Sequence, residues 1–127
     1  LGIKRSSYNQ FEQQYDIIPI KRLNEVANIF NCSVDYIFGL TDNKNYNIIN
    51  KEINLEVSKN RLKTFRKERK ITQNKLAQIL KTTPSVVSGF ERGRNIIATP
   101  FLYELCKKYH VSADYLLGKT NEPQELS

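Results

Sequence analysis

An internal repeat limits what this chain can fold into more than any other feature of its sequence. Residues 1–43 align with residues 80–122 at a constant offset of 79 positions, without a gap, and thirteen positions are identical. The segments NCSVDYIFGLTD and HVSADYLLGKTN are two copies of one element. A repeated segment is one structural unit used more than once, so we expect two related units.

The repeat is incomplete at its N-terminal side. Residues 57–79 precede the repeated part of the second copy and have no counterpart before Leu1, which is not expected to be the natural start because the chain has no Met. Between the copies, Ile53, Leu55 and Val57 alternate with polar residues, which indicates a short extended segment. The expected organisation is a truncated repeat at 1–42, a linker at 43–56, a complete domain at 57–122 and a tail at 123–127.

A helical pattern stops and restarts inside the complete copy, in TQNKLAQILKTTPSVVSGFERGR at 72–94. Leu76 and Leu80 lie on one face of a first short helix. Residues 81–84 break this pattern, and a second apolar stripe that includes Phe90 follows at once. The sequence therefore predicts two short helices joined by a tight turn, which is the helix-turn-helix arrangement.

The expected helix ends carry residues suited to them. Thr72 is a good N-cap, and Pro84 fits the first turn of a helix, where its missing N–H costs nothing. Gly93 is a natural left-handed residue after a helix. Ser112 caps a last helix with Asp114 near its positive end, and Gly118 closes it.

Together these signals predict an all-α domain of five short helices. The first begins at Val57 or Ser58 and buries Leu62 and Phe65. A further helix begins at Pro100, after the helix-turn-helix pair.

The net charge of +7 is distributed unevenly. Residues 1–56 have a net charge of −1 (six basic, seven acidic) and residues 57–127 have +8 (fourteen basic, six acidic). Between Lys59 and Arg94, eleven basic residues are opposed only by Glu68 and Glu91. Such a stretch is typical of polyanion binding, although a solvated helix face would explain the charge alone equally well.

Other classes of function have little support in the sequence. Cys32 and Cys106 fall in apolar helical surroundings and are expected to be buried thiols. One His and two scattered Cys cannot build a zinc site of ordinary spacing, so no metal or other cofactor is expected. His110, Ser112 and Asp114 do not indicate a catalytic set, because His110 aligns with Asn31 while Ser112 and Asp114 recur as helix-start residues of the repeat. We therefore expect no enzyme.

The chain is also not expected to enter a membrane or a secretory route. No apolar run approaches the length that spans a bilayer, and no charged-then-apolar leader occurs. We therefore expect a cytoplasmic protein. Its abundant Asn, Lys and Ile are typical of an AT-rich bacterial or phage genome, so we expect it to be bacterial or phage-encoded.

Residues 59–119 resemble the phage repressor/Cro family, the XRE-type helix-turn-helix regulators. The resemblance lies in RLKTFRKERKITQNKLAQILKTTPSVVSGFERGR and LYELCKKYHVSADYLLG. It implies a five-helix lambda-repressor-like domain that binds operator DNA, usually as a dimer on a palindromic site. The truncated first copy resembles the same family from its recognition helix onward.

Family resemblance and residue chemistry together suggest roles for individual side chains. The resemblance implies that five residues of the recognition helix face the DNA bases: Thr83, Pro84, Ser85, Ser88 and Gly89. The positions expected at the DNA backbone are Thr72, Gln73, Lys75, Lys81, Arg92 and Arg94. The resemblance also implies a structural brace between Arg66 and Glu91. Pro84 and Gly89 stand where family members often have long polar side chains, so direct base readout is expected to be modest.

The first copy departs from the pattern. Glu12 aligns with Glu91 but has no Arg partner before it, and Ile3, Tyr8 and Phe11 would be left exposed. Exposed apolar surface of this kind needs a cover, from upstream residues, the second domain or another subunit. We expect a packing or dimerisation role for this copy.

These inferences predict a sequence-specific, double-stranded DNA-binding transcriptional regulator of the repressor type. It would work as a homodimer or as a pseudo-dimer. The alternative is a protein-interaction or antitoxin-like regulatory module that holds a protein partner through its N-terminal repeat.

Overall fold

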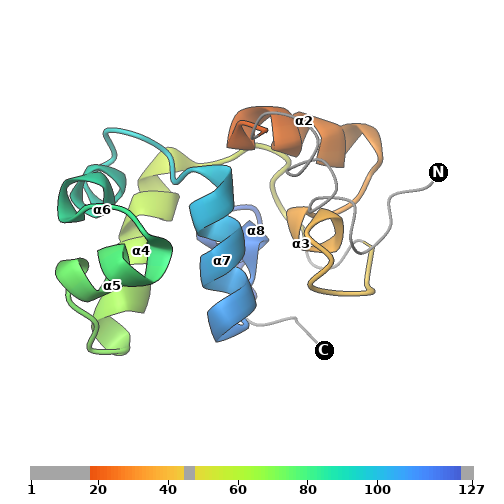
Figure 1. Cartoon of the computed structure of the whole chain (residues 1–127). Coiled ribbons are helices and arrows are strands. Elements are labelled where there is room, and N and C mark those ends of the chain that lie inside the picture. The colour runs from red at the N-terminus through yellow and green to blue at the C-terminus, as the bar shows by residue number, and fades with distance from the viewer. Residues whose placement is uncertain (1–17, 45–47, 124–127) are drawn as a thin grey trace.

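The fold was analysed in a computed structural model, which describes residues 18–44 and 48–123. The regular elements in these ranges are all helices (Figure 1). They are α2 (Ile20–Ile29), α3 (Val34–Ile37), α4 (Leu55–Glu68), α5 (Gln73–Leu80), α6 (Pro84–Glu91), α7 (Thr99–Tyr109) and α8 (Ala113–Leu116). The expected all-α class is therefore confirmed for the described part of the chain.

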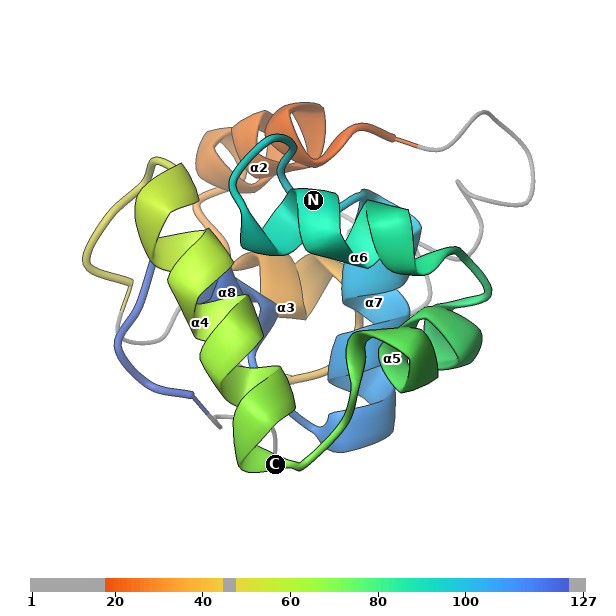
Figure 2. The same cartoon turned by 90° about the vertical axis from the view of Figure 1, so that its left-hand side faces the viewer.

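Two groups of helices flank a central pair. In Figure 1, α7 and α8 lie between α4, α5 and α6 on one side and α2 and α3 on the other. Figure 2 shows the molecule from the left-hand side of Figure 1, where α4, α5 and α6 form the near face. Expectations for Ile3, Tyr8, Phe11 and the first copy's recognition helix lie outside the described residues.

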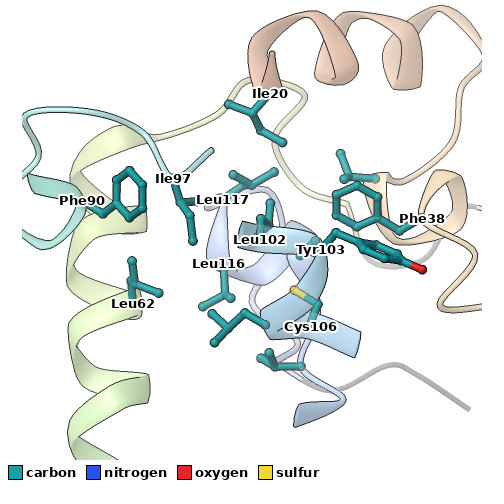
Figure 3. Packing of buried hydrophobic residues seen from close by; sticks show 14 of the residues in the cluster. Ile20, Phe38, Leu62, Phe90, Ile97, Leu102, Tyr103, Cys106, Leu116 and Leu117 are labelled. Carbon is teal, nitrogen blue, oxygen red and sulfur yellow. The ribbon is translucent and has the colours of Figure 1, made fainter. Parts of the chain in front are cut away.

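One hydrophobic core runs through both groups (Figure 3). Leu62 and Phe90 enter it from α4 and α6, and Leu102 lies at its centre on α7. Ile20 and Phe38 enter from the opposite side, where the Phe38 ring meets the edge of Tyr103 at a centroid distance of 5.2 Å. The helices that precede residue 44 are therefore packed as part of the same body as the complete copy.

Local capping chemistry explains where most helices begin and end. The Thr72, Thr83 and Ser112 hydroxyls each accept a hydrogen bond from the backbone N–H three residues later. These side chains satisfy donors that the first turn of a helix leaves free. Gly93 and Gly118 follow helix ends with φ values of +78° and +82°. The predicted caps at Thr72 and Ser112 are confirmed.

Two helix starts and one linker expectation were wrong. Helix α4 begins at Leu55 rather than at Val57 or Ser58, because the Asn54 side chain accepts from the backbone N–H of Val57 at 3.1 Å. Leu55 and Val57 therefore lie in a helix, and Ile53 lies just before it, so the alternation does not mark an extended strand. Helix α7 begins at Thr99, immediately before Pro100.

Both cysteines are buried free thiols, as expected. Burial raises the pKa of Cys106 well above its ordinary value, and the nearby carboxylates of Asp35 and Asp114 raise it further. Burial also raises the pKa of Cys32. Within the described ranges, no helix is both long enough and apolar enough to cross a membrane.

Replacement of Gly118 tests the turn that follows α8. Its φ of +82° is unfavourable for a residue with a side chain, and an added Cβ would lie 2.9 Å from the Cβ of Asn54. We expect Gly118→Ala to lower the free energy of unfolding by about 2 kcal/mol, measured by urea denaturation. Gly89→Ala is the matched control, because its added Cβ meets only Asn95 Nδ2 at 3.8 Å. Equal losses in both variants would contradict this explanation.

Candidate nucleic-acid interface

The turn between α5 and α6 sets the direction of α6. Helix α5 ends at Leu80, and the next residue, Lys81, has a left-handed conformation with φ of +59°. The next backbone N–H, of Thr82, bonds to the carbonyl of Ala77 at 2.8 Å. Thr83 then caps α6, and Pro84 occupies its first turn. Because the C-terminal turn of α5 is followed directly by the N-cap of α6, no flexible residues separate the two helices. The direction of α6 is therefore set by local backbone geometry.

One face of α6 is fixed in the core. Val87 is fully buried, Phe90 is 6% exposed, and the rings of Phe90 and Phe101 lie 6.0 Å apart between centroids. The N-terminal end of α6 is open to solvent, where Thr83, Pro84 and Ser85 are exposed. In Figure 2 this helix lies on the near face of the molecule. The helix therefore presents its N-terminal turn to solvent while its apolar side is held.

A buried ion pair joins α4 to the end of α6. The Arg66 guanidinium donates from Nε to Glu91 Oε2 at 2.6 Å and from a terminal nitrogen to Oε1 at 3.1 Å. The Glu91 side chain is only 2% exposed and that of Arg66 is 11% exposed. Arg66 also donates to the carbonyl of Ile71 at 2.8 Å, just before α5. Paired donation of this kind to a carboxylate holds both charges in one geometry.

Gln73 completes this network, which the sequence did not indicate. Its side-chain amide donates to Glu91 Oε1 at 3.1 Å and so joins α5 to α6. The sequence placed Gln73 at the DNA backbone because of its position in the resemblance, and nothing in its neighbourhood signalled a partner 18 residues away. In the structure this half-buried side chain supports α6.

Gly89 differs in exposure from the other residues that were expected to face the bases. Gly89 is buried, so it does not belong to the solvent-facing side of α6. The chain that follows α6 covers it: the Arg94 N–H donates to the Gly89 carbonyl at 2.9 Å, and Asn95 lies over the position of an added Cβ. Ser88 is half-buried and remains partly accessible beside Ser85.

The charged groups around α6 are almost all basic. The exposed residues of the expected backbone set are Thr72, Lys75, Lys81, Arg92 and Arg94. Between Lys59 and Arg94 the acidic residues are Glu68 and Glu91. Glu91 is buried against Arg66, so it opposes little of the positive field outside the protein. An anion that approaches α6 therefore meets mainly cations.

Comparison with known proteins agrees with this geometry. Residues 62–116, which are less than half of the chain, match the family model described as helix-turn-helix. The chain is also similar to the Uncharacterized HTH-type transcriptional regulator YobD of Bacillus subtilis (strain 168). The identity is 43% over 42 residues, which are 33% of this chain and 38% of that protein.

Removing the cation of the buried pair tests its importance. Arg66→Met would leave the Glu91 carboxylate buried without its partner, at an expected cost of about 3 kcal/mol in the free energy of unfolding. Adding Glu91→Gln should restore part of this loss, because the uncompensated charge is then gone. Urea denaturation of both variants measures the difference.

The exposed pair of Lys59 and Glu56 provides a control for that experiment. Its atoms lie 3.0 Å apart, but the Glu56 side chain is 73% exposed. Glu56→Gln should change stability by about 0.5 kcal/mol or less. A loss for Arg66→Met as small as this would contradict the proposed importance of the buried pair.

Proposed function

We propose that this protein is a sequence-specific, double-stranded DNA-binding transcriptional regulator that inserts α6 into the major groove. The observation that supports this most strongly is that the N-terminal turn of α6 is exposed while the C-terminal end of the helix is held by the network of Arg66, Glu91 and Gln73. In helix-turn-helix proteins the N-terminal residues of the second helix contact base edges. A fixed helix direction is what such readout requires.

The proposed base-facing residues are Thr83, Pro84, Ser85 and Ser88. Hydroxyl groups can donate to or accept from several base edges, and small side chains let the helix approach closely. None of these side chains can make the bidentate contacts that Arg, Asn or Gln make with purines. We therefore propose modest discrimination by α6, with much of the affinity coming from phosphates.

The proposed phosphate contacts come from the exposed residues on both sides of α6. Arg92 and Arg94 follow its C-terminal end, and Lys81 lies in the turn before it. Thr72 and Lys75 stand at the start of α5. Each cation that neutralises a phosphate releases condensed counterions, so binding should weaken steeply with salt.

We further propose that the regulator represses transcription. Its support is the resemblance to the phage repressor/Cro family and the transcriptional-regulator name of the relative, of which this chain covers 38%. An operator occupied by this protein would be closed to polymerase. The alternative role as a protein-interaction module has weaker support, because the described helices of the first copy pack into the shared core.

Arg92 provides the direct test of the phosphate contacts. Arg92→Ala should weaken binding to all duplex sequences alike and reduce the slope of log affinity against log salt by about 1. Fluorescence anisotropy on random-sequence duplex DNA across a salt series measures both quantities. Lys108→Ala is the control, because this substitution also removes one positive charge. Lys108 is exposed in the last turn of α7. The placement is refuted if the two variants have the same slope.

Ser85 provides the test of base readout. Ser85→Gln supplies an amide that can pair with adenine, so sites selected from a random DNA pool should differ from those of the unchanged protein. Discrimination at the affected position should change by about 1–3 kcal/mol, while affinity for random duplex stays the same. Asn60→Gln, exposed on α4, should select the original sites. Unchanged selection by Ser85→Gln would exclude Ser85 from the base contacts.

A further inference from the structure

Helices α3 and α8 make reciprocal hydrogen bonds. The backbone N–H of Val34 donates to Asp114 Oδ1 at 3.0 Å, and the backbone N–H of Ala113 donates to Asp35 Oδ1 at 2.6 Å. Val34 and Ala113 are equivalent positions of the repeat, as are Asp35 and Asp114, because each pair is 79 residues apart. Each copy therefore satisfies the same backbone donor of the other copy with the same carboxylate.

This reciprocity is the mark of an interface with twofold symmetry. In such an interface, a contact from position i to position j is matched by a contact from j to i. The second carboxylate oxygens depart from strict symmetry: that of Asp114 accepts from the Asp35 N–H, and that of Asp35 accepts from the Ser112 hydroxyl. The symmetry is therefore approximate, as expected of two copies whose sequences have diverged.

Backbone geometry around the two helices is also matched. The N–H of Ser33 bonds to the carbonyl of Lys44 at 2.8 Å, and that of Ser112 bonds to the carbonyl of Pro123 at 2.8 Å. These two bonds are again related by the offset of 79 positions. Gly39 follows α3 with φ of +77° just as Gly118 follows α8 with φ of +82°. The same local unit thus lies on both sides of the contact.

The interface is closed to any second molecule. Its central residues are 0% exposed: Ser33, Val34, Asp35, Ser112, Ala113 and Asp114. The ammonium group of Lys119, 1% exposed, lies 3.6 Å from Asp114 and offsets part of the buried negative charge. A second chain could reach the start of α8 only by displacing α3.

The segment that joins the copies is bonded to both of them. The Asn54 N–H donates to the carbonyl of Leu117, and the Ile49 N–H donates to that of Lys119, just after α8. The carbonyl of Lys51 accepts from the Asn24 side chain on α2. These contacts favour pairing of α3 and α8 within one chain over exchange between two chains.

We propose that the chain is a single-chain pseudo-dimer, in which α2 and α3 fill the self-complementary face of α7 and α8 that a second copy would otherwise occupy. The sequence left a homodimer and a pseudo-dimer open, and the reciprocal carboxylates favour the second. One chain then occupies one DNA site, a consequence that rests on the proposed function. Its operator then needs no second half-site for another subunit, unlike the palindromic sites of helix-turn-helix dimers.

Particle mass and DNA stoichiometry test this proposal on the full chain. Sedimentation should give a single species of 14.8 kDa up to the highest attainable concentration. Titration of a tightly bound duplex, selected from a random DNA pool and trimmed to one site, should saturate at one chain per duplex. A stable two-chain species or two chains per duplex would overturn the pseudo-dimer. Failure to bind any DNA would instead refute the proposed function, and the mass would still decide the pseudo-dimer.

A double-mutant cycle tests the interface itself. Asp35→Ala and Asp114→Ala should each lower the urea midpoint, and together they should lower it by less than the sum, because both loosen one shared contact. Asp35→Ala combined with Thr72→Ala, at the distant cap of α5, should be additive. Additive losses for Asp35 and Asp114 would show that the carboxylates act independently and would overturn the reciprocal contact.

Discussion

The buried charge of Glu91 is the constraint on which the arrangement of α4, α5 and α6 depends. A carboxylate that is 2% exposed needs an opposite charge and hydrogen-bond donors. Arg66 on α4 supplies the charge and two donors, and the Gln73 amide on α5 supplies a third donor. Because the partners come from α4 and α5, the same interaction that satisfies the charge also fixes α6 against both. The same ion pair therefore contributes to the stability of the fold and fixes the direction of α6.

A second set of buried carboxylates unites the two copies. Asp35 and Asp114 each accept backbone donors across the boundary between the copies, and the hydrophobic core continues past them from α7 and α8 into α2 and α3 (Figure 3). The short helices α3 and α8 could not bury a sizeable apolar face alone. Their pairing buries the starts of both helices.

The local features of the fold were predictable because their causes are local. The caps at Thr72 and Ser112, the first-turn Pro84 and the left-handed Gly93 act over four or five residues, and each is found where the sequence predicted it. The contact between the Gln73 side-chain amide and Glu91 could not be predicted in this way, because the two residues are 18 positions apart. The start of α4 at Leu55 does have a local cause, the Asn54 cap, which the sequence analysis did not include.

By itself, the sequence determined the helices, the break that separates α5 from α6, the concentration of basic charge and the repeat of 79 residues. Each follows from residue types at short spacing, or from a comparison of the chain with itself. Only the tertiary structure decided which partners the buried charges take. Asp114 was expected to favour the start of its own helix, yet its carboxylate caps α3 of the other copy. The physical reason is that a buried carboxylate binds the donors that packing brings to it, and packing depends on the whole chain.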